Sequence, residues 1–224
     1  KGLTGVELLY DKVLSGNVSK REVVRDASGR VIFEDKGEKE AKPRDLYLTI
    51  DKNIQYFAQE AIRRVVEKNR AELGMALVQD PQNGRILAMA SWPLNIEHIN
   101  TVEWVYEPGS TFKSITLAAA LDKGIVSERD TFYCEKGAWA FNNKVTIHDH
   151  EPEGTLTLSG VIERSSNIGT AKIGLRLGVK DFYLYAKAFG FGAKSGLGFA
   201  GESAGILRPL ENFKQIDLAV GSYG

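Results

Sequence analysis

The amino-acid sequence predicts an α+β fold, with antiparallel strands and helices in separate stretches of the chain. Apolar residues recur with the helical period between residues 54 and 66. Two apolar runs, at 75–78 and 85–89, flank the segment Asp80-Pro81-Gln82-Asn83-Gly84, whose composition is typical of a hairpin turn. Helical patterns dominate after residue 111. This order differs from the alternating strands and helices that build a parallel sheet.

The first part of the chain predicts short elements. Residues 1–45 are polar and uneven, with two short strands expected around a turn between 23 and 33. Alternating apolar residues at 45–50 predict a strand, and Asp51 is a suitable N-cap for the helix that follows and ends near Gly74. The hairpin at 75–89 supplies only two strands, and an isolated hairpin is marginally stable. We therefore expect the sheet to be incomplete in this chain.

The second part predicts helices. Residues 111–123 are rich in Leu and Ala and are followed by Gly124, a typical helix stop. Further helices are expected near 158–163, 168–177 and 180–188, separated by polar or glycine-containing turns.

Composition limits the classes of function. The 224 residues are 43% hydrophobic and 26% charged, which is typical of an ordinary globular protein of one or two domains. Lys+Arg and Asp+Glu both number 29, so net charge does not favour binding to nucleic acid or an anionic membrane. The single Cys134 excludes an intrachain disulfide and is interpreted as a buried small side chain. The chain begins at Lys1 without a signal peptide, and we expect it to be an excised ectodomain.

A serine and a lysine three residues apart, Ser110 and Lys113, open the helix predicted after residue 111. This spacing places both side chains on one helical face. A serine hydroxyl becomes a good nucleophile when a base takes its proton, and a lysine held neutral by burial is such a base. Backbone N–H groups at a helix start also stabilise an oxyanion. The pattern alone fits a solvated helix start equally well, so a second motif must decide.

The second motif is Ser165-Ser166-Asn167, between two predicted helices. Its place in the chain is that of the Ser-x-Asn element of serine acyl-transfer enzymes. Ser165 is a candidate for passing a proton between Lys113 and the leaving group. Asn167 is a candidate for a paired hydrogen bond with a substrate amide. An ordinary helix N-cap is the alternative for this motif taken by itself.

The sequence resembles the class B penicillin-binding proteins, the membrane-anchored transpeptidases that cross-link peptidoglycan. The resemblance spans nearly the whole chain and is carried by Gly5-Val6-Glu7 with Tyr10, Leu48-Thr49-Ile50-Asp51 with Gln55, Asp80-Pro81, Gly84-Arg85-Ile86-Leu87-Ala88-Met89-Ala90, Tyr106-Glu107-Pro108-Gly109-Ser110-Thr111-Phe112-Lys113 and Arg164-Ser165-Ser166-Asn167-Ile168-Gly169. Asn rather than Asp at position 167 favours the division-type branch.

This resemblance implies a β-lactamase/transpeptidase-like fold, in which helices flank an antiparallel sheet beside an all-helical subdomain. It implies that residues 1–45 end the N-terminal pedestal and that 46–224 form the first part of the penicillin-binding domain. Ser110, Lys113, Ser165 and Asn167 would be catalytic, with no cofactor and no metal. The family's Lys-Thr/Ser-Gly motif is expected beyond Gly224, on a C-terminal segment that would complete the sheet and the active site.

The resemblance also implies substrates, partners and a location. The expected activity is D-alanyl-D-alanine transpeptidation of peptidoglycan stem peptides through a serine acyl-enzyme that β-lactam antibiotics trap, in cell wall synthesis and cell division. Cell-wall assembly proteins are the expected partners, with no nucleic acid. The expected location is the periplasmic face of the bacterial membrane, with a single N-terminal anchor outside this chain. A Ser-x-x-Lys β-lactamase and a non-catalytic cell-wall scaffold remain alternatives.

Two further patterns are interpreted as non-functional. Gly196-Leu197-Gly198-Phe199-Ala200-Gly201 matches the dinucleotide-binding glycine pattern, but no strand is predicted before it, so a surface turn is expected. His148-Asp149-His150 lacks the partners and spacing of a metal site and is expected to be an unliganded polar loop. In the family this segment lies beside the active site, which leaves a contact with substrate open.

Overall fold

The computed structural model describes residues 1–16, 23–34, 42–94 and 98–224. The chain divides into two compact units. The first consists of Lys1–Trp104 with Leu197–Glu202, and the second of Val105–Gly196 with Ser203–Gly224. Within the described residues, no helix is long and apolar enough to span a membrane.

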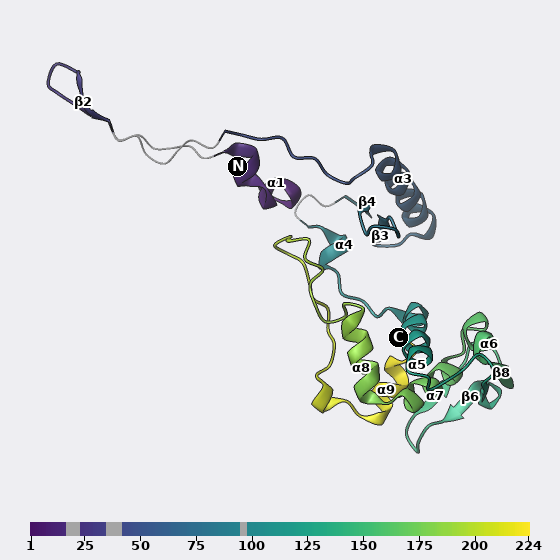
Figure 1. Ribbon diagram of the computed structural model, residues 1–224. Coiled ribbons are helices and arrows are strands. Elements are labelled where there is room, and N and C mark those ends of the chain that lie inside the picture. The colour runs from purple at the N-terminus through teal and green to yellow at the C-terminus, as the bar shows by residue number, and fades with distance from the viewer. Residues whose placement is uncertain (17–22, 35–41, 95–97) are drawn as a thin grey trace. The chain divides into compact units, whose positions relative to one another are not determined.

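The first unit combines one long helix, α3, and several short helices with two hairpins (Figure 1). Its elements are α1 (Gly5–Leu9), α2 (Asp11–Ser15), β1 (Val23–Arg25), β2 (Val31–Glu34), α3 (Lys52–Asn69), β3 (Gly74–Gln79), β4 (Ile86–Trp92) and α4 (Asn100–Glu103). Strand β1 pairs with β2, and β3 with β4, both antiparallel. Both predicted hairpins are therefore confirmed.

Helix α3 begins where the sequence predicts. The Asp51 side chain accepts hydrogen bonds from the backbone N–H groups of Asn53 and Ile54, which satisfies two of the donors at the helix start. The helix ends earlier than Gly74, because Arg70 adopts a left-handed conformation with φ of 52°. Gly74 then lies so close to α3 that a Cβ there would be 2.5 Å from Val66 Cγ2. A glycine is required for β3 to approach the helix.

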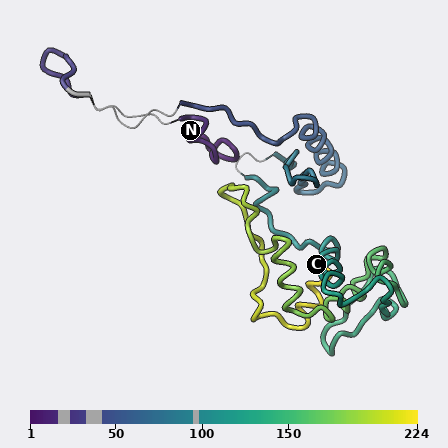
Figure 2. Tube along the Cα trace, in the orientation of Figure 1, coloured from purple at the N-terminus to yellow at the C-terminus, as the bar shows by residue number. Residues whose placement is uncertain are grey.

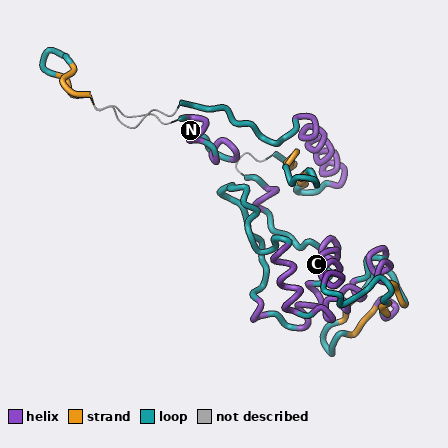
Figure 3. The backbone as a smooth tube through the Cα atoms, in the orientation of Figure 1, coloured by secondary structure: helices purple, strands orange, loops and turns teal. Residues whose placement is uncertain are grey.

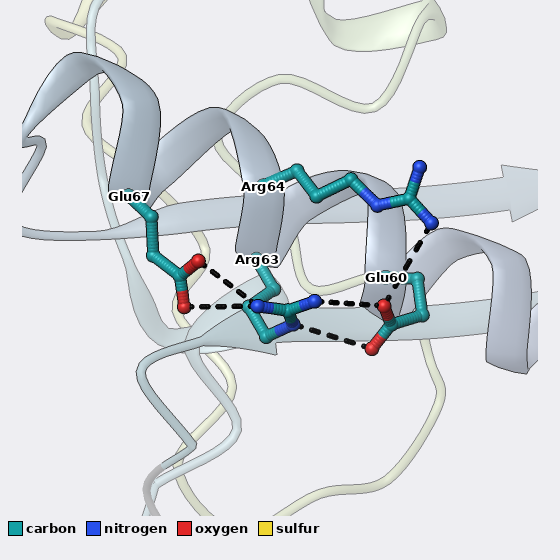
Figure 4. A network of polar contacts seen from close by, with 4 residues as sticks. All are labelled: Glu60, Arg63, Arg64 and Glu67. Carbon is teal, nitrogen blue, oxygen red and sulfur yellow. Dashed lines mark hydrogen bonds and ion pairs between the residues drawn. The ribbon is translucent and has the colours of Figure 1, made fainter.

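One face of α3 carries a network of ion pairs (Figure 4). The Arg63 guanidinium lies 2.9 Å from Glu60 Oε2 and 2.9 Å from Glu67 Oε2, and Arg64 also reaches Glu60 at 3.9 Å. The hydrogen bond from Arg63 lowers the pKa of the Glu60 carboxyl group. These pairs at spacings of three and four residues stabilise the solvent-facing side of the helix.

The strand predicted at 45–50 is wrong: this segment is irregular. The segment runs beside β4 and is joined to it by two hydrogen bonds. Thr49 Oγ1 donates to the Ile86 carbonyl (2.6 Å), and the Asp51 N–H at the end of the segment donates to the Leu87 carbonyl (2.9 Å). The chain then enters α3. At the next pairing position on β4, Met89, the Gln55 side chain occupies the place that a strand backbone would take. Its amide donates to the Met89 carbonyl and accepts from the Met89 N–H, both at 2.8 Å.

The second unit is mainly helical, with short strands (Figure 3). Its elements are a 3-10 turn η1 (Gly109–Phe112), α5 (Lys113–Asp122), β5 (Thr131–Tyr133), η2 (Glu135–Gly137), β6 (Ala138–Ala140), β7 (Thr146–His148), β8 (Thr155–Thr157), α6 (Leu158–Glu163), α7 (Asn167–Leu177), α8 (Val179–Ala188), η3 (Leu210–Asn212) and α9 (Gln215–Gly221). The four helices predicted here are confirmed as α5, α6, α7 and α8, and Gly124 follows α5 with φ of 64°.

The sequence did not predict strands β5 to β8. They form two antiparallel pairs, β5 with β8 and β6 with β7. Each strand has three residues, which is too short for an alternating pattern to be recognised. Every sheet in the described residues is two-stranded.

Helix α7 forms the centre of the second unit. Its buried residues include Ile168, Ala171 and Ile173, which pack into two separate apolar clusters. At Gly174 an added Cβ would lie 1.8 Å from Ser222 Oγ, so the absence of a side chain allows the end of α9 to lie against the helix. The Thr116 hydroxyl on α5 donates to the Ser222 carbonyl at 2.7 Å. The C-terminus therefore lies beside α5, as Figure 2 also shows.

Candidate active site

Ser110 lies in the one-turn 3-10 helix η1, which continues directly into α5 at Lys113. Gly109 precedes it with φ of 58°, a left-handed conformation that favours glycine. The Gly224 backbone packs against the Gly109 carbonyl so tightly that a Cβ on Gly224 would be 2.0 Å from that oxygen. Ser110 is therefore exposed on a turn whose first residue packs against Gly224. The α-helix predicted from residue 111 begins at Lys113, after this 3-10 turn.

The structure brings three of the predicted site residues together through their side chains. Lys113 Nζ donates to Ser165 Oγ at 2.9 Å, and Ser165 Oγ donates to Ser110 Oγ at 3.1 Å. Lys113 Nζ also donates to the Ser165 carbonyl oxygen at 2.5 Å. The three groups form one continuous hydrogen-bonded chain from the ammonium to the exposed hydroxyl.

Lys113 is buried, with 2% of its surface exposed. Burial lowers the pKa of its amine below the ordinary lysine value, and the nearby Asp149 carboxylate opposes this by raising it. The balance is towards a lowered pKa. A lysine in this environment becomes neutral at a lower pH than a lysine in water, and a general base must be neutral to accept a proton.

Ser165 ends helix α6 in a strained conformation. Its backbone N–H bonds to the Ile162 carbonyl at 3.0 Å, and the Ser166 N–H bonds to the Val161 carbonyl at 2.9 Å. This pair of bonds is the Schellman motif, in which the residue at Ser165's position is usually glycine because its φ is positive. Ser165 has φ of 52°. A non-glycine residue held in the left-handed region is often found where the side chain has a function.

Asn167 is the first residue of α7, and Ser166 is its N-cap. Asn167 Nδ2 donates to the His148 carbonyl at the end of β7, at 2.8 Å. The carboxamide has a second N–H and a carbonyl oxygen, which leaves one donor and one acceptor for a further partner. Asn167 is linked to Ser165, and so to the Lys113–Ser165–Ser110 chain, through the backbone of Ser166. Its side chain bonds separately to β7.

Sequence reasoning missed the importance of Asp149 and Ser166. Ser166 is fully buried, and its hydroxyl donates to Asp149 Oδ2 at 2.7 Å. Asp149 Oδ1 accepts from the Ile168 N–H at 2.9 Å. The expectation for 148–150 concerned metal binding and did not foresee that Asp149 binds the start of α7. No pattern in the sequence links the residue that follows β7 to a helix start 19 positions later.

Two glycine-containing patterns, the hexapeptide 196–201 and the tripeptide 194–196, lie in irregular backbone. The segment 196–201 follows no strand and contains no helix, in agreement with the predicted turn. The family's third motif was expected only beyond Gly224, yet Lys194-Ser195-Gly196 matches its letters. These three residues lie in an irregular stretch after α8 rather than on a sheet strand. They therefore lack the strand geometry that the motif requires.

No group of three or more His, Cys, Asp or Glu side chains in the described ranges is arranged to bind a metal. Cys134 is buried as expected, and burial raises the pKa of its thiol. Such a thiol is a poor nucleophile. The side-chain groups that hydrogen bonds bring together at this site are the hydroxyls of Ser110 and Ser165 and the amine of Lys113.

The family model described as "Penicillin binding protein transpeptidase domain" matches residues 74–224. The chain belongs to this family of penicillin-binding transpeptidases of peptidoglycan synthesis, in its class B. The recognition made from the sequence motifs is confirmed.

Individual relatives agree with this assignment. The chain is 33% identical to stage V sporulation protein D of Bacillus subtilis over 100% of this chain and 37% of that protein. It is 31% identical to the peptidoglycan D,D-transpeptidase FtsI of Escherichia coli, over 100% of this chain and 40% of that protein. The chain thus spans less than half the length of these relatives.

Among solved structures, the transpeptidase domain of penicillin-binding protein 3 from Burkholderia pseudomallei is similar, with a TM-score of 0.74 and 36% identity. The match covers 79% of this chain and 52% of that one. The chain therefore has the transpeptidase-domain fold, with the mixed α and β content that the sequence predicts.

Proposed function

We propose that the protein is a peptidoglycan D,D-transpeptidase that cross-links stem peptides through a serine acyl-enzyme. The observation that carries the proposal is the hydrogen-bonded chain from buried Lys113 through Ser165 to exposed Ser110. This arrangement joins a nucleophile, a proton carrier and a base with a lowered pKa in the order that acyl transfer needs.

In the proposed reaction, Ser110 Oγ attacks the carbonyl carbon of the penultimate D-Ala, and its proton passes to Lys113. The bond to the terminal D-Ala nitrogen then breaks, and Ser165 delivers a proton from Lys113 to that leaving amine. The amine of a neighbouring stem peptide then attacks the ester carbonyl, the bond from that carbon to Ser110 Oγ breaks, and the proton that the amine loses returns to Ser110 Oγ through Lys113. A β-lactam also acylates Ser110 in the first step, and it stays attached to Ser110 as an acyl-enzyme. Asn167 would hold the substrate amide through its remaining donor and acceptor.

The position of the whole protein in the cell is part of the proposal. Peptidoglycan lies outside the membrane, so we place the domain on the periplasmic face, with an N-terminal anchor outside this chain. Similarity to FtsI supports a division-type role, together with Asn167. Residues 1–45 would end a pedestal, residues 46–224 would begin the catalytic domain, and cell-wall assembly proteins would be partners.

A further C-terminal segment would complete the sheet. The β3–β4 pair has only two strands, and Leu77 on β3 remains 47% exposed. On α3, Phe57 is 67% and Val65 is 55% exposed. Large apolar groups gathered on one small unit favour a covering segment. We propose that this segment carries the Lys-Thr/Ser-Gly motif on a strand.

Intact-mass measurement after incubation with benzylpenicillin tests the function, using the full-length protein encoded by the gene. A stable adduct is expected on the wild type and on Ser114→Ala, and none on Ser110→Ala. Ser114 is a matched control because it is exposed in α5, which continues directly from the turn that carries Ser110, and its hydroxyl donates to the Thr111 carbonyl at 2.7 Å. Rapid release of the adduct would favour a β-lactamase, and no adduct on the wild type would favour a non-catalytic scaffold.

A further inference from the structure

We propose that Asp149 is a positioning residue for acylation: its two carboxylate oxygens fix the turn that carries Ser165 and Asn167. This inference rests on the proposed function. Asp149 would touch neither the substrate nor Ser110, and would act through Ser166 and the start of α7.

Both oxygens of Asp149 are used by the turn. Oδ2 accepts from the Ser166 hydroxyl at 2.7 Å, and Oδ1 accepts from the Ile168 N–H at 2.9 Å. Ser166 and Ile168 are both fully buried. A carboxylate at the start of a helix also interacts favourably with the helix dipole. Removal of Asp149 would leave a buried N–H without this partner and free the turn to move.

The turn connects Asp149 to the reacting groups. Ser165 immediately precedes Ser166, and its hydroxyl lies between Lys113 Nζ and Ser110 Oγ. Asn167 immediately follows and donates to the carbonyl of His148, the residue beside Asp149 on the same strand end. His148 and Asp149 therefore bond to Ser166, Asn167 and Ile168, and Ser165 directly precedes these three residues in the chain.

Strand β7, which ends at His148 just before Asp149, is itself held in place. Strand β7 pairs with β6, with Trp139 opposite Ile147, and the Asp149 N–H bonds to the Gly137 carbonyl at 3.1 Å. Lys172 on α7 lies 5.0 Å from the centre of the Trp139 ring and donates to Glu135 Oε1 at 2.6 Å. These contacts fix the β6–β7 pair against the helix whose start Asp149 binds.

The charge of Asp149 provides a second effect that a purely structural residue would lack. Its carboxylate favours the protonated form of Lys113, against the effect of burial. Among the charged groups on the helices packed against α5, Lys172 pairs with Glu135, Arg176 with Asp130 and Asp181 with Lys123, and Tyr185 donates to Asp122. Helix α8 also carries Lys180 and Lys187. In the part of the chain that the structure describes, the carboxylate that raises the Lys113 pKa is that of Asp149.

The test measures the acylation rate constant with a fluorescent penicillin from about pH 5 to about pH 10, on the full-length protein. Asp149→Asn keeps the shape and an acceptor for the Ile168 N–H but removes the charge. We expect its plateau rate to fall between about 10-fold and 100-fold, as for a small misplacement of reacting groups. Its acidic limb should move to lower pH, because the Lys113 pKa loses the opposing carboxylate.

Asp130→Asn is the matched control, because Asp130 pairs with Arg176 on the same α7 helix away from the turn. It should leave both the plateau and the limb unchanged. An Asp149→Asn variant with the wild-type plateau, or with a lower plateau and an unmoved limb, would overturn the inference. Failure of the wild type to react with penicillin would instead overturn the proposed function itself.

Discussion

The Ser165 hydroxyl lies 3.1 Å from the Ser110 hydroxyl and is held there by a left-handed backbone, with φ of 52°. The two serines are 55 residues apart in the chain and come together because helix α6 ends at this point in a Schellman motif. The position at which a helix stops therefore determines where the proposed proton carrier lies.

Replacement of Ser165 should separate stability from activity. Ser165→Gly and Ser165→Ala both remove the hydroxyl, so both should lose penicillin acylation. Ser165→Gly should be more stable than Ser165→Ala by about 1 kcal/mol, because only glycine adopts the left-handed conformation without steric cost. Denaturant unfolding measures the difference. Equal stability of the two variants would contradict a left-handed Ser165.

The pH dependence of acylation should report the Lys113 amine. Only the neutral amine accepts a proton, and burial lowers its pKa. The acylation rate should therefore rise with pH along a limb centred below the ordinary lysine value of about 10.4. Stopped-flow measurement of the rate against pH locates the limb. Centring at or above the ordinary value would exclude a buried lysine as the base.

Replacement of Lys113 by Met should stabilise the fold while it abolishes acylation. Because the pKa of Lys113 is lower in the folded state than in the unfolded state, the charged amine reduces the free energy of unfolding. This destabilisation is complete at any pH below the lowered pKa. We expect Lys113→Met to gain about 1 kcal/mol at neutral pH. The gain should shrink as pH rises from the lowered pKa towards the unfolded value. Unfolding curves at several pH values test this, and destabilisation at neutral pH would contradict it.

Gly174→Ala should destabilise the second unit, although Ala usually favours a helix. An added Cβ would lie 2.6 Å from Ser222 Cβ as well as against its hydroxyl, and Ser222 is fully buried. We expect a loss of about 1–3 kcal/mol from overpacking. Gly154→Ala is the control, because an added Cβ there meets nothing within 4 Å. Thermal unfolding compares the two variants, and equal melting temperatures would disprove the close packing.

Much of this structure could be predicted because local rules determine it. The cap at Asp51, the turn between β3 and β4, and the stop at Gly124 each depend on residues close together in the chain. Ser110 and Lys113 were recognisable from their spacing at a helix start.

The remainder depends on contacts between distant residues. The strand predicted at 45–50 is absent because the Gln55 side chain, rather than another stretch of backbone, bonds to Met89. Ser165 was recognised as a candidate, but its left-handed backbone was not, because glycine is the usual sign of that conformation. Asp149 was missed because its partners lie at the start of a helix, 17 and 19 residues away.

The division into two units has a consequence for the order in which the chain folds. Leu197–Glu202 belongs to the first unit, where Gly198 lies against Leu9 and Gly201 against Glu103. Helices α5 to α8 lie in the chain between these partners and this segment. The first unit therefore cannot be completed until most of the second unit has emerged on the side of the membrane where the domain folds.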